Sequence, residues 1–180
     1  MTTPGGIARS GSPSAATALV SALKARGWTV ATAESLTAGL LAATIADVPG
    51  ASAVLRGGLV VYATELKHVL ADVPQQVLTR YGAVSAETAR ALATGAAARC
   101  GANVGIGLTG VAGPDEQEGR PVGTVFVGVS VTGRAPWVER LALTGDRGRI
   151  RVDACTAAME LVTEVARSPD VGGQEGRLGR

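Results

Sequence analysis

The residues of this sequence that could carry out chemistry fall in three segments, each at the end of an expected strand or the start of an expected helix. The first segment is residues 33–39, in which Ser35 lies between a strand and a helix. A serine hydroxyl becomes a nucleophile when a base removes its proton, and the unpaired N–H groups of a first helical turn bind an oxyanion or a phosphate. The alternative is that Ser35 only caps the helix.

The second segment is residues 62–67, where Tyr62 ends a strand and Lys67 lies near the start of a short helix. Lys67 is either a solvated surface lysine or a base that is partly desolvated beside Ser35, with a lowered pKa. His68 is the only histidine, so it alone could complete a Ser-His-acid triad. Adjacent helical residues point about 100° apart, so we do not expect Lys67 and His68 to serve one site.

The third segment combines residues 108–114 with residues 144–147. A strand that runs into a glycine-rich loop can present backbone N–H groups to an anion. Arg147, at the start of the last expected helix, could bind a phosphate or carboxylate through two parallel hydrogen bonds. The alternatives are an ordinary turn for the loop and a surface ion pair for Arg147.

Two other motifs match known signatures without the structural context that those signatures need. Residues 105–110 fit the dinucleotide fingerprint G-x-G-x-x-G, but they lie inside an expected strand and no helix follows. Residues 21–24 fit the S-x-x-K motif near the end of a helix, and no Ser-Asp-Asn or Lys-Thr-Gly element follows. We therefore set both motifs aside.

The composition excludes several classes of protein. Among 180 residues there are 25 glycines but only five aromatic side chains (one Phe, two Trp and two Tyr), too few for a base-stacking platform. The net charge of +2 gives no field for a polyanion, and the longest uncharged stretch, residues 100–114, is too short to span a bilayer. Two cysteines and one histidine form neither a disulfide framework nor a zinc site. We expect no nucleic-acid partner, no membrane, no metal, and a cytoplasmic location.

Helical and strand patterns alternate between two polar tails, residues 1–13 and 168–180, which we expect to be disordered. Valine-rich strands without a polar face indicate a sheet that is covered on both sides, and a tight connection at residues 132–134 makes one strand pair antiparallel. The prediction is a single α/β domain, residues 14–167, with three layers (α/β/α) and a mixed, mostly parallel sheet. The expected helices are 14–26, 36–46, 65–70, 74–81, 85–100 and 146–167, and the expected strands are 28–33, 54–62, 103–108, 122–131 and 137–143.

Taken in order, six segments resemble the CinA C-terminal domain family, the nicotinamide-nucleotide amidases. The resemblance covers nearly all of the chain between the tails. Many members carry a molybdopterin-binding-like domain before this one, and the present chain resembles the stand-alone form. The matching segments are residues 33–39, 56–62 with Lys67, 82–85, 109–114, 121–125, and 145–147 with Arg151.

The resemblance implies hydrolysis of the carboxamide of nicotinamide mononucleotide to nicotinic acid mononucleotide and ammonia. It implies a small-molecule nucleotide substrate, no cofactor and a homodimer. Ser35 would be the nucleophile and Lys67 its base, with Tyr62 close by. The implied substrate-binding residues are Thr37, Thr109, Gly110, Gly113 and Arg147.

The sequence departs from the family pattern after Gly113-Pro114. Family members have a glycine-rich stretch there, whereas this chain has Asp115-Glu116-Gln117-Glu118. We expect these carboxylates to repel a phosphate unless they point outward. Two alternatives to the amidase therefore stay open. The chain could be a non-catalytic nucleotide-binding or competence-associated module, or an amidase for a different pyridine or nucleoside amide.

Overall fold

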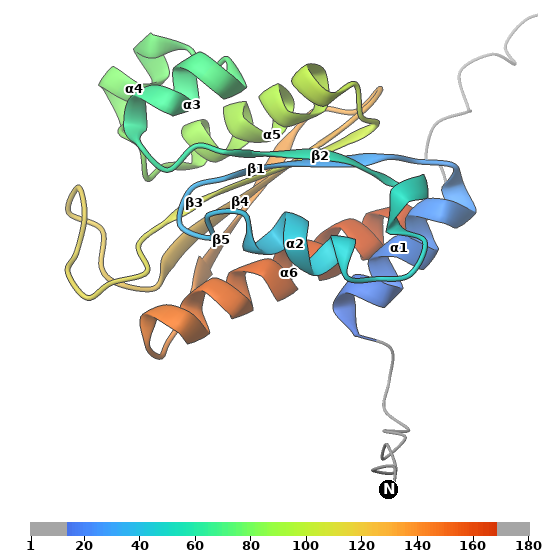
Figure 1. Ribbon diagram of the computed structural model, residues 1–180. Coiled ribbons are helices and arrows are strands. Elements are labelled where there is room, and N and C mark those ends of the chain that lie inside the picture. The colour runs from blue at the N-terminus through green and yellow to red at the C-terminus, as the bar shows by residue number, and fades with distance from the viewer. Residues whose placement is uncertain (1–13, 169–180) are drawn as a thin grey trace, which may run out of the picture.

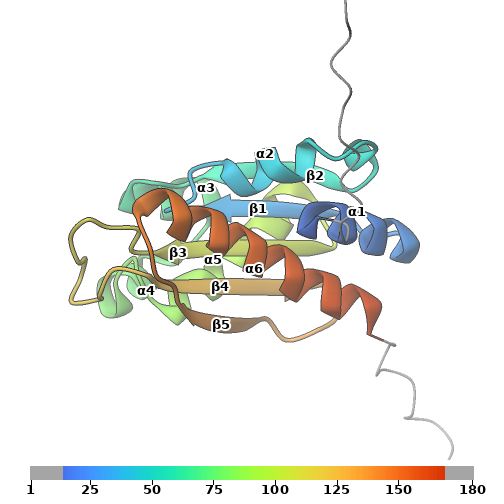
Figure 2. The ribbon, with the colours of Figure 1, turned by 90° about the horizontal axis from the view of Figure 1, so that it is seen from below.

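The computed structural model describes residues 14–168 as a five-stranded sheet with helices on both of its faces (Figures 1 and 2). The tails expected to be disordered lie outside the described residues, except for Ser168. The strands are β1 (Val30–Glu34), β2 (Leu55–Val60), β3 (Val104–Gly110), β4 (Thr124–Val131) and β5 (Trp137–Ala142). The helices are α1 (Ala15–Arg26), α2 (Leu40–Ala46), α3 (Thr64–Ala71), α4 (Gln75–Tyr81), α5 (Ala86–Cys100) and α6 (Arg147–Arg167), with a 3₁₀ turn at Ala51–Ala53.

The sheet is mixed, as predicted, with the strand order β2-β1-β3-β4-β5. β1 pairs in parallel with β2 and with β3, whereas β4 is antiparallel to both β3 and β5. Four strands therefore run one way and β4 runs the other. The carboxyl ends of β1, β2 and β3 meet at the same edge, which in open α/β sheets is where ligands bind.

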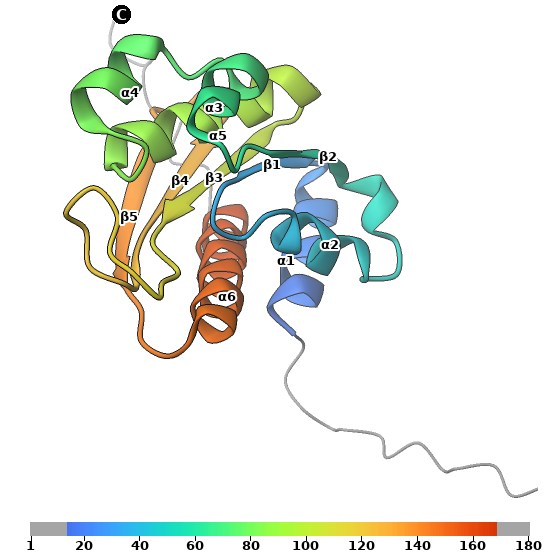
Figure 3. The same cartoon turned by 60° about the vertical axis from the view of Figure 1, so that its left-hand side comes forward.

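Two helical layers enclose the sheet and make the predicted three-layer arrangement. α3, α4 and α5 lie on one face, and α1, α2 and α6 lie on the other (Figures 1 and 3). The larger apolar core lies between the sheet and α1 and α6, and it includes Leu19, Leu23, Ile106 and Ile150. No helix among residues 14–168 is long and apolar enough to cross a membrane.

Small residues let α5 approach the sheet closely. A Cβ atom added to Gly107 of β3 would lie 2.5 Å from the backbone nitrogen of Ala93 and 2.7 Å from the Cβ of Leu92. Side chains never pack at such distances, so only glycine fits between β3 and α5. The glycine-rich, aromatic-poor composition therefore produces a core in which backbone contacts backbone.

The helix caps follow the sequence signals. Ser85 caps α5 by accepting a hydrogen bond from the N–H of Thr88 at 3.2 Å, with Glu87 in the first turn. Asp146 caps α6 in the same way through the N–H of Arg149 at 2.8 Å. Both helices therefore begin where the sequence predicts, within one residue.

Two predicted elements differ in the structure. The helix expected from residue 36 begins at Leu40. Ala38 (φ 50°) and Gly39 (φ 91°) adopt left-handed conformations, which cannot be part of a right-handed helix. The strand expected to be buried over residues 54–62 is the edge strand β2, whose side chains alternate between half-buried and exposed. It is exposed because it has only one neighbouring strand, β1.

The remaining boundary shifts are small but they affect the site. β1 ends at Glu34 rather than at Ala33, and β3 continues through Gly110 rather than ending at Leu108. The expected loop from residue 109 therefore begins at Val111. β4 begins at Thr124, two residues later than predicted.

Candidate active site

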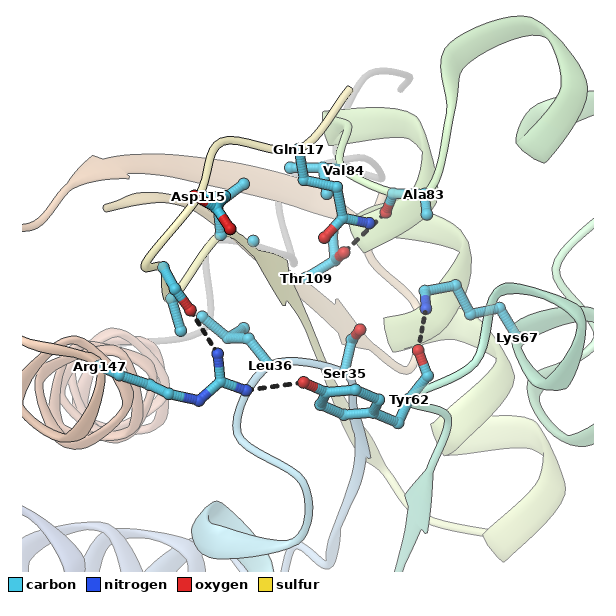
Figure 4. Close-up of a pocket in the computed structure, with 14 residues that line it drawn as sticks. Ser35, Leu36, Tyr62, Lys67, Ala83, Val84, Thr109, Asp115, Gln117 and Arg147 are labelled. Carbon is cyan, nitrogen blue, oxygen red and sulfur yellow. Dashed lines mark hydrogen bonds between the residues drawn. The ribbon is translucent and has the colours of Figure 1, made fainter. Parts of the chain in front are cut away.

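A pocket of about 140 Å³ lies at the edge where β1, β2 and β3 end (Figure 4). Loops after these strands, the segment before α5 and the start of α6 form its walls. Of the eight predicted site residues, all but Thr37 line this pocket, and they come from four separate parts of the chain. The seven that line it are Ser35, Tyr62, Lys67, Thr109, Gly110, Gly113 and Arg147.

Lys67 is buried, with an exposed fraction of 1%. Its Nζ donates hydrogen bonds to the carbonyl oxygens of Val61 at 2.9 Å and Tyr62 at 3.3 Å. Burial lowers the pKa of Lys67 below its ordinary value of 10.5, while the carboxylates of Glu118 and Glu65 act in the opposite direction. The interpretation of Lys67 as a solvated surface lysine is therefore wrong, and the structure presents it as a desolvated amine in the pocket.

Ser35 directly follows β1, and its N–H donates to the carbonyl of Leu108 at 2.9 Å. This bond continues the pairing of β1 with β3 and brings the serine to the pocket. The side chain is half-buried, and no group among residues 14–168 forms a hydrogen bond with its hydroxyl. Ser35 is not a helix cap, because the capping position of α2 is Gly39. Its hydroxyl is thus available to a ligand.

The carboxylate of Glu34 binds the N–H groups at the start of α2. This buried carboxylate accepts hydrogen bonds from the N–H groups of Gly39 (3.0 Å), Leu41 (3.0 Å) and Ala42 (2.9 Å). The hydroxyl of Thr32 donates a fourth, at 3.0 Å. These three N–H groups are therefore not available to an oxyanion or a phosphate, because the protein's own carboxylate occupies them.

Arg147 bridges two walls of the pocket at its mouth. Its Nη2 donates to the hydroxyl of Tyr62 at 2.7 Å, and its Nη1 donates to the carbonyl of Gly113 (Figure 4). It is not the surface ion pair that we considered as its alternative. A guanidinium has five N–H groups, so those not used in these two bonds remain available to an anion.

Tyr62 connects the two ends of the pocket. Figure 4 shows its hydroxyl turned toward Arg147 and its backbone carbonyl turned toward Lys67. The side chain of Tyr62 is exposed, with an exposed fraction of 54%. Its ring therefore forms an open apolar wall beside Ser35.

Thr109 and the glycines near it shape the floor of the pocket. The hydroxyl of Thr109 donates to the carbonyl of Ala83 at 2.6 Å and so joins the end of β3 to the segment before α5. A Cβ atom on Gly110 would lie 2.6 Å from the carbonyl oxygen of Thr124, so no side chain fits there. Gly113 offers its carbonyl to Arg147.

Thr37 is the predicted site residue that the structure does not bring to the pocket. It is fully buried, and its hydroxyl has no hydrogen-bond partner among residues 14–168. Its carbonyl accepts a hydrogen bond from Nη2 of Arg151 at 2.8 Å, while Nε of Arg151 donates to the carbonyl of Leu36 at 3.0 Å. Thr37 thus belongs to the support of the site rather than to its surface.

The carboxylates of the acidic loop occupy different positions relative to the pocket. The carboxylate of Glu118 accepts hydrogen bonds from the N–H groups of Ala83 at 3.1 Å and Val84 at 3.0 Å. Asp115 and Gln117 line the pocket, whereas Glu116 does not. One carboxylate therefore faces the pocket, and another anchors the loop.

His68 plays no part in this pocket. Its Nδ1 lies 2.8 Å from the carbonyl oxygen of Val73, and the residue is not among those that line the pocket. The prediction that Lys67 and His68 do not share a site is confirmed. Within residues 14–168, no group of three His, Cys, Asp or Glu side chains could hold a metal ion.

Comparison with known proteins identifies the family. The sequence profile of the CinA C-terminal domain matches residues 13–166. The chain belongs to the CinA C-terminal domain family. A CinA-like protein of Frankia casuarinae is 50% identical over 138 residues, which is 76% of this chain and 31% of that protein. This CinA-family chain thus spans about a third of the length of the curated relatives it matches.

Solved structures of CinA proteins share the fold. A competence-damaged protein (CinA) superfamily protein from Klebsiella pneumoniae superposes with a TM-score of 0.82 at 33% identity, covering 84% of this chain and 95% of the other. A competence/damage inducible protein from Agrobacterium tumefaciens gives a TM-score of 0.80 at 30% identity, covering 88% and 99%. The predicted α/β architecture and the predicted family are both confirmed.

Proposed function

We propose that this chain is an amidohydrolase that converts nicotinamide mononucleotide to nicotinic acid mononucleotide and ammonia. The observation that carries the proposal is Lys67, a buried amine with a lowered pKa, which lines the same pocket as the free hydroxyl of Ser35. Amide hydrolysis requires a nucleophile, a proton acceptor and a site for the oxyanion. Serine–lysine pairs are a known variant of the serine triad.

The hydrogen bonds of Lys67 suit a neutral amine. A neutral amine has two N–H groups and one lone pair, and the carbonyls of Val61 and Tyr62 supply two acceptors. With both N–H groups bound to these carbonyls, the lone pair of Lys67 remains to accept the proton of Ser35. Binding of the substrate's cationic pyridinium nearby would further disfavour the ammonium form.

The reaction then proceeds in two stages. Ser35 Oγ attacks the carboxamide carbon as its proton passes to Lys67, and the tetrahedral intermediate collapses when Lys67 returns this proton to the departing ammonia. Lys67 next takes a proton from water, which attacks the ester on Ser35. The C–O bond to Ser35 breaks, Ser35 regains a proton from Lys67, and nicotinic acid mononucleotide leaves. One water is consumed and one ammonia is released.

The backbone N–H of Leu36 is our candidate for the oxyanion donor. Leu36 follows Ser35 and lines the pocket, and no acceptor among residues 14–168 binds its N–H. In other serine hydrolases the N–H of the residue after the nucleophile has the same task. Removing one such donor costs about 10²–10³-fold in rate in well-studied enzymes.

The size of the pocket indicates how the substrate lies. Sites that enclose a whole drug-sized ligand measure roughly 300–1,000 Å³, and this pocket measures about 140 Å³. The pyridine carboxamide would therefore occupy the enclosed part beside Ser35. The ribose phosphate would extend past the mouth, where Arg147 has N–H groups for the phosphate. The Asp115 carboxylate would face the pyridinium or the ribose hydroxyls.

The direct test is to incubate the chain with nicotinamide mononucleotide and to measure ammonia and nicotinic acid mononucleotide. We expect both products in equal amounts, and little ammonia from free nicotinamide, which lacks the phosphate. Binding of the mononucleotide without ammonia release would favour the non-catalytic module instead. Equal rates with both amides would overturn the assignment of Arg147. The homodimer stays a prediction, which sedimentation of the chain would test.

A further inference from the structure

Two side chains of opposite charge hold the turn that carries Ser35, and neither lines the pocket. Glu34, at the end of β1, binds the N–H groups at the far end of the turn and the start of α2. Arg151, from α6, binds the carbonyls of Leu36 and Thr37. We propose that Glu34 and Arg151 are positioning residues that form one clamp on the turn Ser35–Gly39 and hold the Ser35 hydroxyl in its attacking position. This inference rests on the proposed function of Ser35.

The turn needs such support because two of its residues adopt left-handed backbone conformations. Ala38 has a φ of 50°, a conformation that non-glycine residues rarely adopt, and Gly39 follows at 91°. Within the turn, the N–H of Ala38 donates to the backbone carbonyl of Ser35 at 3.1 Å. The N–H of Leu40, at the start of α2, donates to the backbone carbonyl of Thr37 at 3.1 Å. A backbone in sparsely populated conformations persists where its surroundings fix it, and such conformations cluster at active sites.

The two residues of the clamp bind different kinds of backbone group: Glu34 binds N–H groups, and Arg151 binds carbonyl oxygens. The Glu34 carboxylate, an acceptor only, takes the N–H groups of Gly39, Leu41 and Ala42. The Arg151 guanidinium, a donor only, takes two carbonyls next to Ser35 in the sequence. Because the charged partners come from β1 and α6, the turn is fixed to the sheet on one side and to the last helix on the other.

Cys155 shows that both charges act on the same buried region. It lies one helical turn after Arg151 on α6 and is 2% exposed. Burial, and secondarily the Glu34 carboxylate, raise the pKa of its thiol to about 12, whereas Arg151 acts in the opposite direction. Both charges therefore act on this one buried thiol of α6. Because neither residue lines the pocket, the clamp would affect the rate through the turn that carries Ser35.

The experiment replaces Arg151 by Met and by Lys, and Glu34 by Gln, with Arg140→Met on the exposed face of β5 as control. We expect Arg151→Met to lower kcat about 100-fold, the cost of misplacing a reacting group by about 1 Å, with KM for nicotinamide mononucleotide unchanged within twofold. Arg151→Lys restores part of kcat, and guanidinium ion at millimolar concentration restores part of the activity of Arg151→Met. Loss of stability alone would give neither rescue.

A second readout separates this inference from the proposed function. The rate at which a fluorophosphonate labels Ser35 reports how the hydroxyl is held, without nicotinamide mononucleotide. A wild-type protein that labels at Ser35 but releases no ammonia would refute the amidase and leave the clamp testable. Labelling that slows about 10-fold or more in Arg151→Met and Glu34→Gln, and not in Arg140→Met, supports the clamp. Wild-type kcat and wild-type labelling in folded Arg151→Met and Glu34→Gln would overturn it.

Discussion

The Nζ atom of Lys67 lies 2.9 Å from the carbonyl oxygen of Val61, inside the fold and at the wall of the pocket. Val61 directly follows the edge strand β2. Lys67 is the only residue of α3 that lines the pocket, and its amine binds the backbone at the end of that strand. Burial makes this amine costly to protonate and lowers its pKa. The chemistry proposed for the pocket depends on that cost.

Replacing Lys67 by Met should make stability less dependent on pH. The folded-state pKa of Lys67 is below its unfolded value of 10.5, so between these two values the unfolded chain binds a proton that the folded chain does not. The wild type therefore loses stability as pH falls from 10.5 toward the folded-state pKa, below which the loss is complete. The melting temperature of Lys67→Met minus that of the wild type should therefore be largest at low pH and shrink toward pH 10. A difference that is constant between pH 6 and pH 10 would contradict the lowered pKa. Lys24→Met, at an exposed position on α1, is the control.

Replacing Glu118 by Gln should shift the pH dependence of activity. The rate should rise with pH as Lys67 loses its proton, and the negative charge of Glu118 raises the pKa of Lys67. Removing that charge lowers this pKa, so the acid limb of the kcat/KM profile moves to lower pH. Glu116→Gln, two residues away and outside the pocket lining, should leave the profile in place. A shift to higher pH in Glu118→Gln would be inconsistent with this account.

Replacing Arg147 by Met should separate the two amide substrates. A hydrogen bond to a charged group contributes about 1.5–3 kcal/mol, so KM for nicotinamide mononucleotide should rise roughly 10- to 100-fold. The slow reaction of free nicotinamide should change much less, because it has no phosphate. Steady-state kinetics with both amides measure this, with Arg140→Met as control. The same loss for both substrates would mean that Arg147 acts through Tyr62 and the loop rather than on the phosphate.

Replacing Gly107 by Ala should destabilise the fold without touching the pocket. The added Cβ would lie 2.5 Å from the backbone nitrogen of Ala93, and overpacking of this kind costs about 1–3 kcal/mol. Urea unfolding measures the change. Gly148→Ala, in the first turn of α6, meets only an ordinary contact of 3.4 Å with Asp146 and should be neutral or stabilising, since alanine favours helices. Equal stability of both variants would show that α5 does not approach β3 so closely.

The fold was largely predictable because its signals are local. Serine caps and glycine stops fixed helices such as α5, and the valine-rich pattern identified β4 as a buried strand. The exposure of β2 could not be predicted in this way. Apart from Arg56, its residues 55–60 are apolar or glycine, and its place at the edge depends on the order of strands across the sheet.

Most of the pocket was also predictable, because three parallel strands bring their carboxyl ends together. What the sequence did not reveal is the support behind it. Glu34 and Arg151 act on backbone groups of a turn whose shape depends on the left-handed conformation of Ala38, an alanine that carries no signal for it. For the same reason Thr37, expected in the pocket, is buried behind it. The resemblance to the family included Arg151 but gave it no role.

The central claim is that Ser35 attacks the amide and that Lys67 takes its proton. The most direct measurement is ammonia release from nicotinamide mononucleotide by the wild type, Ser35→Ala and Lys67→Ala, with Ser52→Ala and Lys24→Ala as exposed controls and circular dichroism to confirm folding. We predict that both controls match the wild type and that ammonia release is abolished in the folded Ser35 and Lys67 variants. Full activity in either of those two variants would contradict the account.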